Sequence, residues 1–257
     1  FGTTVDDAWG YTFIDRAACK AIYDKYSHGT EWTPPSEKGL IIQPGMVNNW
    51  GGGAYDPERN LLITNARRFS LYVGLPPADT IDMEDARSPQ AGMPSGPAGI
   101  IKNTEHAMER GPDKVFSFPE VSPNLPMFSP CTKPPWYVLV AMNLSTGEVE
   151  WEVPLGNLAK SLRLPLPLKF GAVGIGGPMV TAGGIVFIGA TADETFRAFD
   201  IETGKEIWSD ELPTSNMTNP MTYERGGRQY VVLAAGGHHI FYPQKVSDYL
   251  IAYALPE

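Results

Sequence analysis

The sequence predicts an all-β fold of short strands joined by tight turns, and two features of its composition support this. Glycine and proline are abundant, with 27 Gly and 24 Pro among 257 residues. This is a share of about 20 %, against a usual share near 12 %. Charged residues make up 19 % of the chain, less than a helical bundle or coiled coil carries. The composition therefore favours many strands and turns over long helices.

An internal repeat makes the fold prediction more specific. The frame Ala-x-(Asn/Asp)-x-x-Thr-Gly-x-x-x-Trp occurs at residues 141–151 and again 57 positions later, at residues 198–208. A second pattern, Pro-Met followed by a Gly-Gly turn and an apolar strand, begins at Pro178 and again at Pro220. Four-stranded sheets that repeat at this period are typical of a β-propeller.

Each position of the eleven-residue frame has a physical role in such a sheet. Alanine is small, which lets a neighbouring sheet pack closely. Asn or Asp and Thr hydrogen-bond the backbone of a turn, and Gly supplies the positive φ that a hairpin needs. We expect the Trp to lie between adjacent sheets, with its ring N–H bonded to a partner.

Three segments are distinguished along the chain. Residues 1–32 are a helical lead-in, residues 66–135 are a long Pro-rich insertion, and residues 136–257 form the regular repeated sheets. A helix is predicted over residues 11–26, with an apolar stripe of Ile14, Ala17, Ala18, Ala21 and Ile22. Strands are predicted from Leu40 onward and, at the end of the chain, over residues 250–255.

Charge and cysteine content exclude several classes of function. The formal net charge is −9 and no basic stripe is present, which argues against a nucleic-acid partner. The longest purely apolar stretch, Trp136–Met142, is far shorter than a membrane-spanning helix. Cys19 and Cys131 are too few for a four-cysteine zinc site. They form either one disulfide or two buried thiols, and the sequence leaves both open.

The repeated frame resembles the tryptophan-docking motif of the quinoprotein dehydrogenases, which use pyrroloquinoline quinone (PQQ). Other segments resemble the C-terminal half of the membrane-bound, glucose-oxidising members, and the relatives that oxidise quinate, shikimate or polyols share this half. These segments are residues 8–57, 130–136, 176–193, 219–239 and 248–256.

The resemblance implies about half of an eight-bladed β-propeller, with one N-terminal helix and a long insertion. It also implies an enzyme that oxidises a sugar, polyol or cyclic hydroxy acid, with glucose the first expectation, and passes electrons to ubiquinone. The cofactors would be PQQ and Ca²⁺ or Mg²⁺. The membrane anchor, the metal-binding carboxylates and the catalytic Asp and Lys would lie upstream of the matched segment. We therefore expect no metal ligand in this chain, no turnover by this part alone, and a location at the periplasmic face of the bacterial inner membrane.

Four side chains carry the predicted site. By resemblance, the amide of Asn65 bonds the quinone cofactor, while Asp193 and His238 are catalytic residues in the active site. Trp50, flanked by glycines, lines the cofactor pocket. Each has a structural alternative: a strand-end cap for Asn65, a turn for Asp193, a surface loop for His238 and a core position between sheets for Trp50.

Two other functions are compatible with the same repeat. One is a cofactor-free propeller that binds other proteins, similar to the outer-membrane assembly lipoproteins. The other is an inert or regulatory fragment whose open sheet edges pair with a second copy. Scattering of Asn65, Asp193 and His238 over the outside would favour the cofactor-free propeller, and sedimentation would separate a monomer from an edge-paired dimer.

Overall fold

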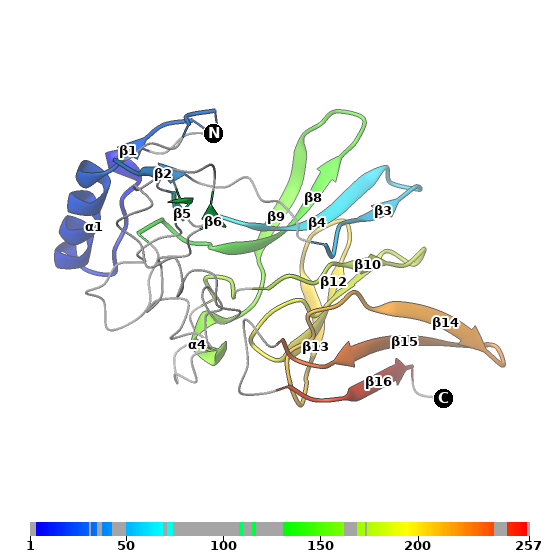
Figure 1. The fold of residues 1–257 in the computed structure, drawn as a ribbon. Helices are drawn as coiled ribbons and strands as arrows, with labels where there is room; N and C mark the ends of the chain where they lie inside the picture. Colours follow the sequence, from blue (N-terminus) through cyan, green and yellow to red (C-terminus); the bar gives the residue numbers. More distant parts are fainter. Residues whose placement is uncertain are drawn as a thin grey trace. The chain divides into compact units, whose positions relative to one another are not determined.

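A computed structural model describes residues 4–30, 32–34, 38–42, 50–68, 71–73, 108–109, 115–116, 131–161, 169–172, 174–238 and 246–255. The chain forms two compact units (Figure 1), which are described separately. The first unit comprises Phe1–Gly45 and Arg68–Pro134, and the second comprises Met46–Arg67 and Pro135–Glu257.

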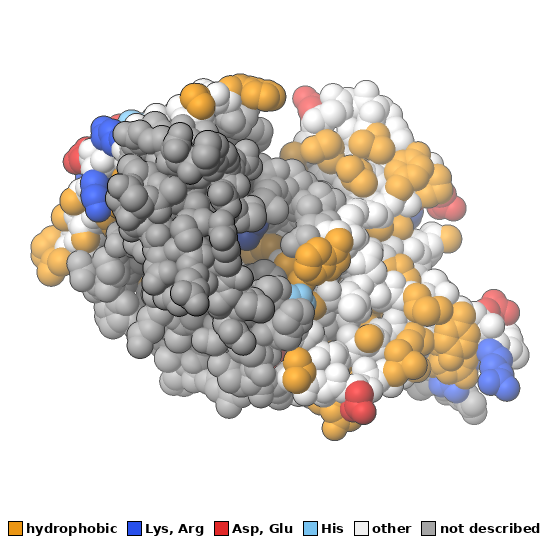
Figure 2. Space-filling view, in the orientation of Figure 1, with side chains coloured by type: hydrophobic (Ala, Val, Ile, Leu, Met, Phe, Trp, Pro, Cys, Tyr) orange, Lys and Arg blue, Asp and Glu red, His pale blue; other side chains and the backbone are white. Residues whose placement is uncertain are grey.

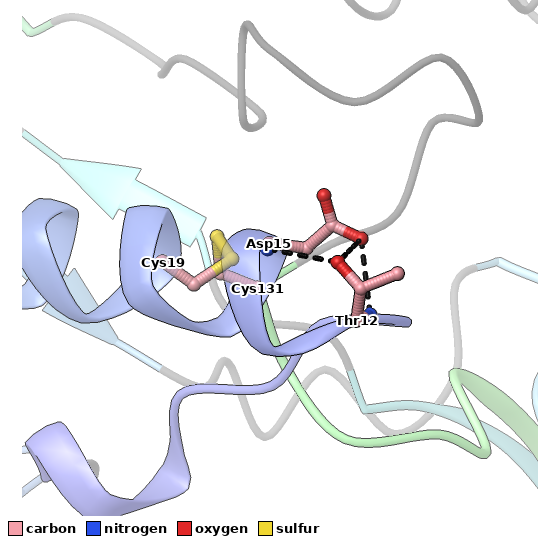
Figure 3. Close-up of a disulfide and its surroundings, with 4 residues drawn as sticks. All are labelled: Thr12, Asp15, Cys19 and Cys131. Atoms are coloured by element: carbon pink, nitrogen blue, oxygen red, sulfur yellow. Dashed lines mark hydrogen bonds between the residues drawn. A yellow bond between two sulfur atoms is a disulfide. The ribbon is translucent and has the colours of Figure 1, made fainter.

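The first unit contains the predicted helix, α1 (Phe13–Lys25), which follows the short 3₁₀ helix η1 (Val5–Asp7). Thr12 caps α1, because its hydroxyl accepts a 3.2 Å hydrogen bond from the Asp15 backbone N–H. The Asp15 carboxylate in turn accepts a 3.1 Å bond from the Thr12 N–H (Figure 3). This reciprocal pair is a capping box, and it sets the start of the helix.

The predicted apolar stripe of α1 is confirmed only in part. Ile14 is 65 % exposed and Ala17 and Ala21 are exposed, whereas Ile22 packs beside the buried Cys19 and Tyr23. Cys19 forms a disulfide with Cys131 (Figure 3), which ties this side of the helix to the buried cluster. The disulfide also answers the question that the two cysteines left open.

Short strands complete the first unit. Strand β2 (Leu40–Ile42) pairs in parallel with β1 (Ser27–His28) and antiparallel with β5 (Leu71–Val73). A separate hairpin joins β6 (Met108–Glu109) to β7 (Val115–Phe116). Most of the predicted insertion over 66–135 lies outside the described residues.

The second unit contains three antiparallel sheets within the described residues (Figure 1). The first has the order β3 (Ala54–Asp56), β4 (Leu61–Arg67), β8 (Tyr137–Asn143), β9 (Val149–Pro154). The second has the order β10 (Met179–Val180), β11 (Ile185–Ile188), β12 (Thr195–Asp200), β13 (Glu206–Glu211). The third comprises β14 (Met221–Arg225), β15 (Arg228–Ala235) and β16 (Tyr249–Ala254). A short helix, α4 (Leu158–Ser161), follows β9.

Apolar clusters hold neighbouring sheets together. Ile63 and Leu139 of the first sheet share a buried cluster with Ile188 of the second. Phe196 of the second sheet packs with Leu233 of the third. Sheets that stack face to face in chain order confirm the all-β prediction and form part of a propeller.

The turn residues of the repeated frame behave as predicted in both copies. Asn143 and Asp200 each accept hydrogen bonds from backbone N–H groups two and three residues later. Gly147 and Gly204 adopt φ values of +75° and +67°. In each copy the strand register also shifts directly after the frame's alanine.

The two tryptophans of the frame differ in burial. Trp151 docks as expected: its ring N–H donates a 2.7 Å hydrogen bond to the Ile201 carbonyl of the second sheet. Trp208 is 40 % exposed and contacts Phe196 and Tyr253 edge to face. It therefore lies between the second and third sheets as predicted, but it is less buried than Trp151.

The third sheet exposes an apolar face. Met221 is 55 % exposed and Tyr223 is 40 % exposed, and hydrophobic side chains gather over β14 and β15 (Figure 2). The opposite face carries Leu233, which packs toward the second sheet.

Candidate functional site

The candidate site is built around glycines that precede the first strands of two sheets. Gly51 lies before β3, and Gly176 and Gly177 lie before β10. A Cβ added to Gly51 would overlap the backbone of Gly176 and Gly177, and one added to Gly177 would overlap the backbone of Gly51. The two segments can approach this closely only because neither carries a side chain there.

Asn219 joins these two segments. Its amide Nδ2 donates a 2.7 Å hydrogen bond to the Gly51 carbonyl, and its Oδ1 accepts a 2.9 Å bond from the Gly177 N–H. Asn219 itself lies two residues before β14. The segments that precede the first strands of the three described sheets therefore meet at this side chain.

Asn65 lies beside the same glycines. It belongs to β4 and is 1 % exposed. Its Nδ2 donates to the Gly176 carbonyl at 2.9 Å and to the Tyr137 hydroxyl. Its Oδ1 is buried and has no hydrogen-bond partner among the residues that the structure describes. A buried acceptor without a partner costs about 1–3 kcal/mol, so this oxygen is suited to bind a donor from a ligand.

Two further polar groups are neighbours of Asn65. Burial raises the pKa of the Tyr137 phenol to about 12. Burial also lowers the pKa of the Arg67 guanidinium, which interacts electrostatically with Tyr137. The phenol stays protonated at neutral pH. The site thus combines a neutral donor, a neutral amide and a cation.

Trp50 and His238 are brought together, although 188 positions separate them in the sequence. Their rings are stacked, with centroids 6.1 Å apart and planes 20° apart. Trp50 is 69 % exposed, so it is not a core residue. Because Trp50 precedes Gly51, the stacked pair and the buried amide of Asn65 belong to one connected region.

Asp193 belongs to a different hydrogen-bond network. Its carboxylate is 1 % exposed, forms an ion pair with Arg197, and accepts a 2.7 Å bond from the Thr191 hydroxyl. It also accepts a 2.8 Å bond from the Asn157 backbone N–H, directly before α4. These bonds lead to the segment around α4 and not to the glycines beside Asn65.

Comparison with known proteins identifies the family of this fold. Residues 2–231 match the model of the PQQ glucose/ethanol/alcohol dehydrogenase β-propeller domain. The chain belongs to this family. The PQQ propeller family thus accounts for the repeated Trp motif, and the predicted resemblance is confirmed.

Relatives within the PQQ propeller family match nearly the whole chain. The chain is 35 % identical to quinoprotein glucose dehydrogenase A of Acinetobacter calcoaceticus over 264 residues. It is 36 % identical to the glycerol dehydrogenase large subunit of Gluconobacter thailandicus over 262 residues. These alignments cover 99 % and 98 % of the chain, but 31 % and 34 % of the relatives. The chain thus spans about a third of the length of these relatives.

A solved structure supports the fold. The crystal structure of quinohemoprotein alcohol dehydrogenase from Comamonas testosteroni aligns with 91 % of the chain and 28 % of its own length. The TM-score is 0.52 and the sequence identity is 21 %. The likeness confirms a partial propeller.

Sequence analysis missed two residues of this site, Asn219 and Tyr137. A signal for Asn219 is present in the repeat, because Asn219-Pro220-Met221 aligns with Gly177-Pro178-Met179. Asn219 is a polar residue at a repeat position that is glycine in the preceding sheet, and this difference could have marked it as a candidate site residue. No comparable sequence signal marks Tyr137, because its role depends on the register that places β8 beside β4.

Among the described residues, no group of three or more His, Cys, Asp or Glu side chains is arranged to hold a metal ion. None of the helices in the described part of the chain is long and apolar enough to cross a membrane.

Proposed function

We propose that the protein carrying this chain is a PQQ-dependent dehydrogenase that oxidises a sugar or polyol, and that this chain forms part of its cofactor pocket. Family membership supports the class of enzyme. Two relatives are named for glucose and glycerol, which supports a polyhydroxylated substrate. Glucose stays the first expectation among these.

The observation that carries the proposal is the unpartnered Oδ1 of Asn65. PQQ is a flat quinone with several carboxylates, and a pocket for it needs neutral hydrogen-bonding groups and positive charge. Asn65 and Tyr137 supply the neutral groups, and the Arg67 guanidinium supplies charge. The residues present therefore fit the group, and we propose that Asn65 holds it.

The remaining predicted residues receive distinct roles. When bound, PQQ accepts the hydride that leaves the alcohol carbon. We propose that Trp50 provides an apolar wall, and that His238 hydrogen-bonds a substrate hydroxyl or the cofactor. Asp193, predicted as catalytic, has its carboxylate engaged by Arg197 and the Asn157 N–H. We propose that it acts by holding the segment before α4.

The other elements of the proposed enzyme come from the resemblance. Ca²⁺ or Mg²⁺ would be bound by carboxylates upstream, and ubiquinone would accept the electrons. A periplasmic location agrees with the Cys19–Cys131 disulfide, because disulfides persist in oxidising compartments. A homodimer paired through the edge of β16 is a separate expectation, and sedimentation velocity tests it.

Reconstitution tests the proposal. The full-length protein that contains this chain is loaded with PQQ and Ca²⁺ or Mg²⁺, and dye-linked oxidation of glucose, glycerol and quinate is measured. We expect PQQ-dependent turnover of at least one of these substrates. We also expect Asn65→Ala to weaken PQQ binding, and His238→Ala to change substrate KM or PQQ retention.

Two controls make the outcome decisive. The 257-residue chain alone, given the same PQQ and cation, should show no turnover. Asn143→Ala, in the turn between β8 and β9, should bind PQQ like the wild type. If the full-length protein neither binds PQQ nor oxidises any substrate, a cofactor-free interaction propeller becomes the better interpretation.

A further inference from the structure

We infer that Asn219 is a positioning residue of the candidate site, which holds Trp50 against His238 by fixing the backbone of Gly51. The inference rests on the proposed function for its consequence in cofactor binding. The positioning of Trp50 against His238 by Asn219, however, can be tested without any cofactor.

The first step is the position of Asn219 among the sheets. Its two hydrogen bonds reach the Gly51 carbonyl before β3 and the Gly177 N–H before β10. A Cβ at Gly176 would lie 2.7 Å from the Thr218 carbonyl, so the segment that carries Asn219 packs tightly against the glycines. One side chain therefore links the segments that precede the first strands of three sheets.

The second step is chemical complementarity. Backbone carbonyl and N–H groups that are withdrawn from water need partners. A carboxamide is neutral and offers a donor and an acceptor on one short arm, which matches a carbonyl and an N–H that lie close together. Alanine would supply neither bond, and aspartate would supply an acceptor alone.

The third step connects Gly51 to the stacked rings. Trp50 is followed by three glycines, and Gly52 adopts a φ of +61°. Such a run has wide conformational freedom, so the backbone alone does not fix the direction of the indole. The Asn219 bond to the Gly51 carbonyl restrains this run directly after Trp50. The stacking of Trp50 on His238 therefore depends on that bond.

The fourth step connects the same anchor to Asn65. The Gly176 carbonyl accepts the hydrogen bond from Asn65 Nδ2, and the next N–H, of Gly177, donates to Asn219. Asn219 thus holds the peptide that orients the Asn65 amide. Its side chain bonds the backbone of Gly51 and Gly177, next to Trp50 and to the peptide that Asn65 contacts, which is the pattern of a positioning residue.

Nuclear magnetic resonance of the histidine ring protons tests the inference in the cofactor-free full-length protein that contains this chain. This chain alone contributes four histidines, so His238→Gln assigns the His238 signals. The Trp50 ring current displaces these signals, and Trp50→Leu defines the position without it. We expect Asn219→Ala to lose at least half of this displacement, while Asn143→Ala, at the far end of β8 from Tyr137, retains it.

Asn219→Asp separates positioning from general stability. The carboxylate keeps an acceptor for the Gly177 N–H but opposes the Gly51 carbonyl, so the ring-current displacement should fall as in Asn219→Ala. If Asn219→Ala does not fold, the Asp variant decides the outcome. A folded Asn219→Asp or Asn219→Ala protein with the wild-type displacement would overturn the inference.

Binding of PQQ to the full-length protein provides the second readout. We expect both Asn219 variants to raise the Kd for PQQ by about fivefold, which corresponds to about 1 kcal/mol. If the wild type does not bind PQQ but the ring-current displacement depends on Asn219, the proposed function fails and the positioning role stands. If the wild type binds PQQ and the displacement ignores Asn219, the positioning role fails alone.

Discussion

The indole N–H of Trp151 donates a 2.7 Å hydrogen bond to the Ile201 carbonyl and so joins the first sheet to the second. The same ring lies over Gly204, in the turn that follows Ile201. One tryptophan therefore contributes both a specific hydrogen bond and an apolar contact between two sheets.

Replacing Trp151 should cost more than replacing Trp208. We expect Trp151→Ala to lower the free energy of unfolding by about 3 kcal/mol, because it removes packing and a hydrogen bond. Trp208→Ala should cost about half as much, since Trp208 is 40 % exposed. Urea unfolding followed by circular dichroism measures both. Equal losses would contradict the difference in docking.

Gly204 should tolerate a methyl group less well than Gly147, its counterpart in the repeat. Both have positive φ, so alanine at either costs about 1–2 kcal/mol in backbone strain. At Gly204 the new Cβ would also lie 2.6 Å from Trp151 Cε3, whereas at Gly147 it meets nothing within 4 Å. Gly204→Ala should therefore have the lower Tm. Identical Tm values would show that the indole moves away freely.

Breaking the Asp193–Arg197 pair should strongly destabilise the second unit. Asp193 is buried, and Asp193→Asn would leave the Arg197 guanidinium with the more exposed Glu206, 3.4 Å from its Nε, as its remaining carboxylate partner. Removing one partner of a buried pair costs about 3–5 kcal/mol. The double variant Asp193→Asn/Arg197→Met should recover part of this loss in urea unfolding. If Asp193→Asn alone left the free energy of unfolding unchanged, this would argue that the pair is not desolvated.

Reduction of the Cys19–Cys131 disulfide should destabilise the first unit. The two cysteines are 112 residues apart. Closing a loop of that size lowers the entropy of the unfolded chain and so stabilises the folded state by about 4 kcal/mol. Dithiothreitol, or Cys19→Ser, should speed proteolysis within that unit. Peptides from residues 174–238 of the second unit should appear at unchanged rates. Acceleration in both units alike would contradict a local role.

Alkaline pH should destabilise the protein through Tyr137. The pKa of the buried phenol is about 12 in the folded state, against about 10 when unfolded. The folded state holds the proton more tightly, so this stabilisation is present below pH 10 and is lost as the pH rises toward 12. The loss is about 2–3 kcal/mol. Tyr137→Phe should show a correspondingly shallower decline in unfolding free energy over this range. Parallel profiles would contradict the shifted pKa.

The sequence by itself determined the repeated sheets. The frame ending in Trp151 and Trp208 fixes turns, bulges and strand pairs, because each of its residues acts on neighbours a few positions away. Local chemistry of this kind also set the start of α1 at Thr12 and Asp15. Such features depend on short-range hydrogen bonds and backbone preferences, which a sequence pattern expresses directly.

Tertiary structure alone decided which residues meet. Trp50 stacks on His238, and Asn219 reaches Gly51 across 168 positions, because sheets distant in sequence converge at their first strands. The side of α1 that carries Cys19 is likewise tied by a disulfide to Cys131, 112 positions away, a contact that the apolar stripe did not indicate. Asp193 illustrates the same limit: Arg197 and Asn157 engage its carboxylate, and only long-range packing brings the Asn157 N–H within reach.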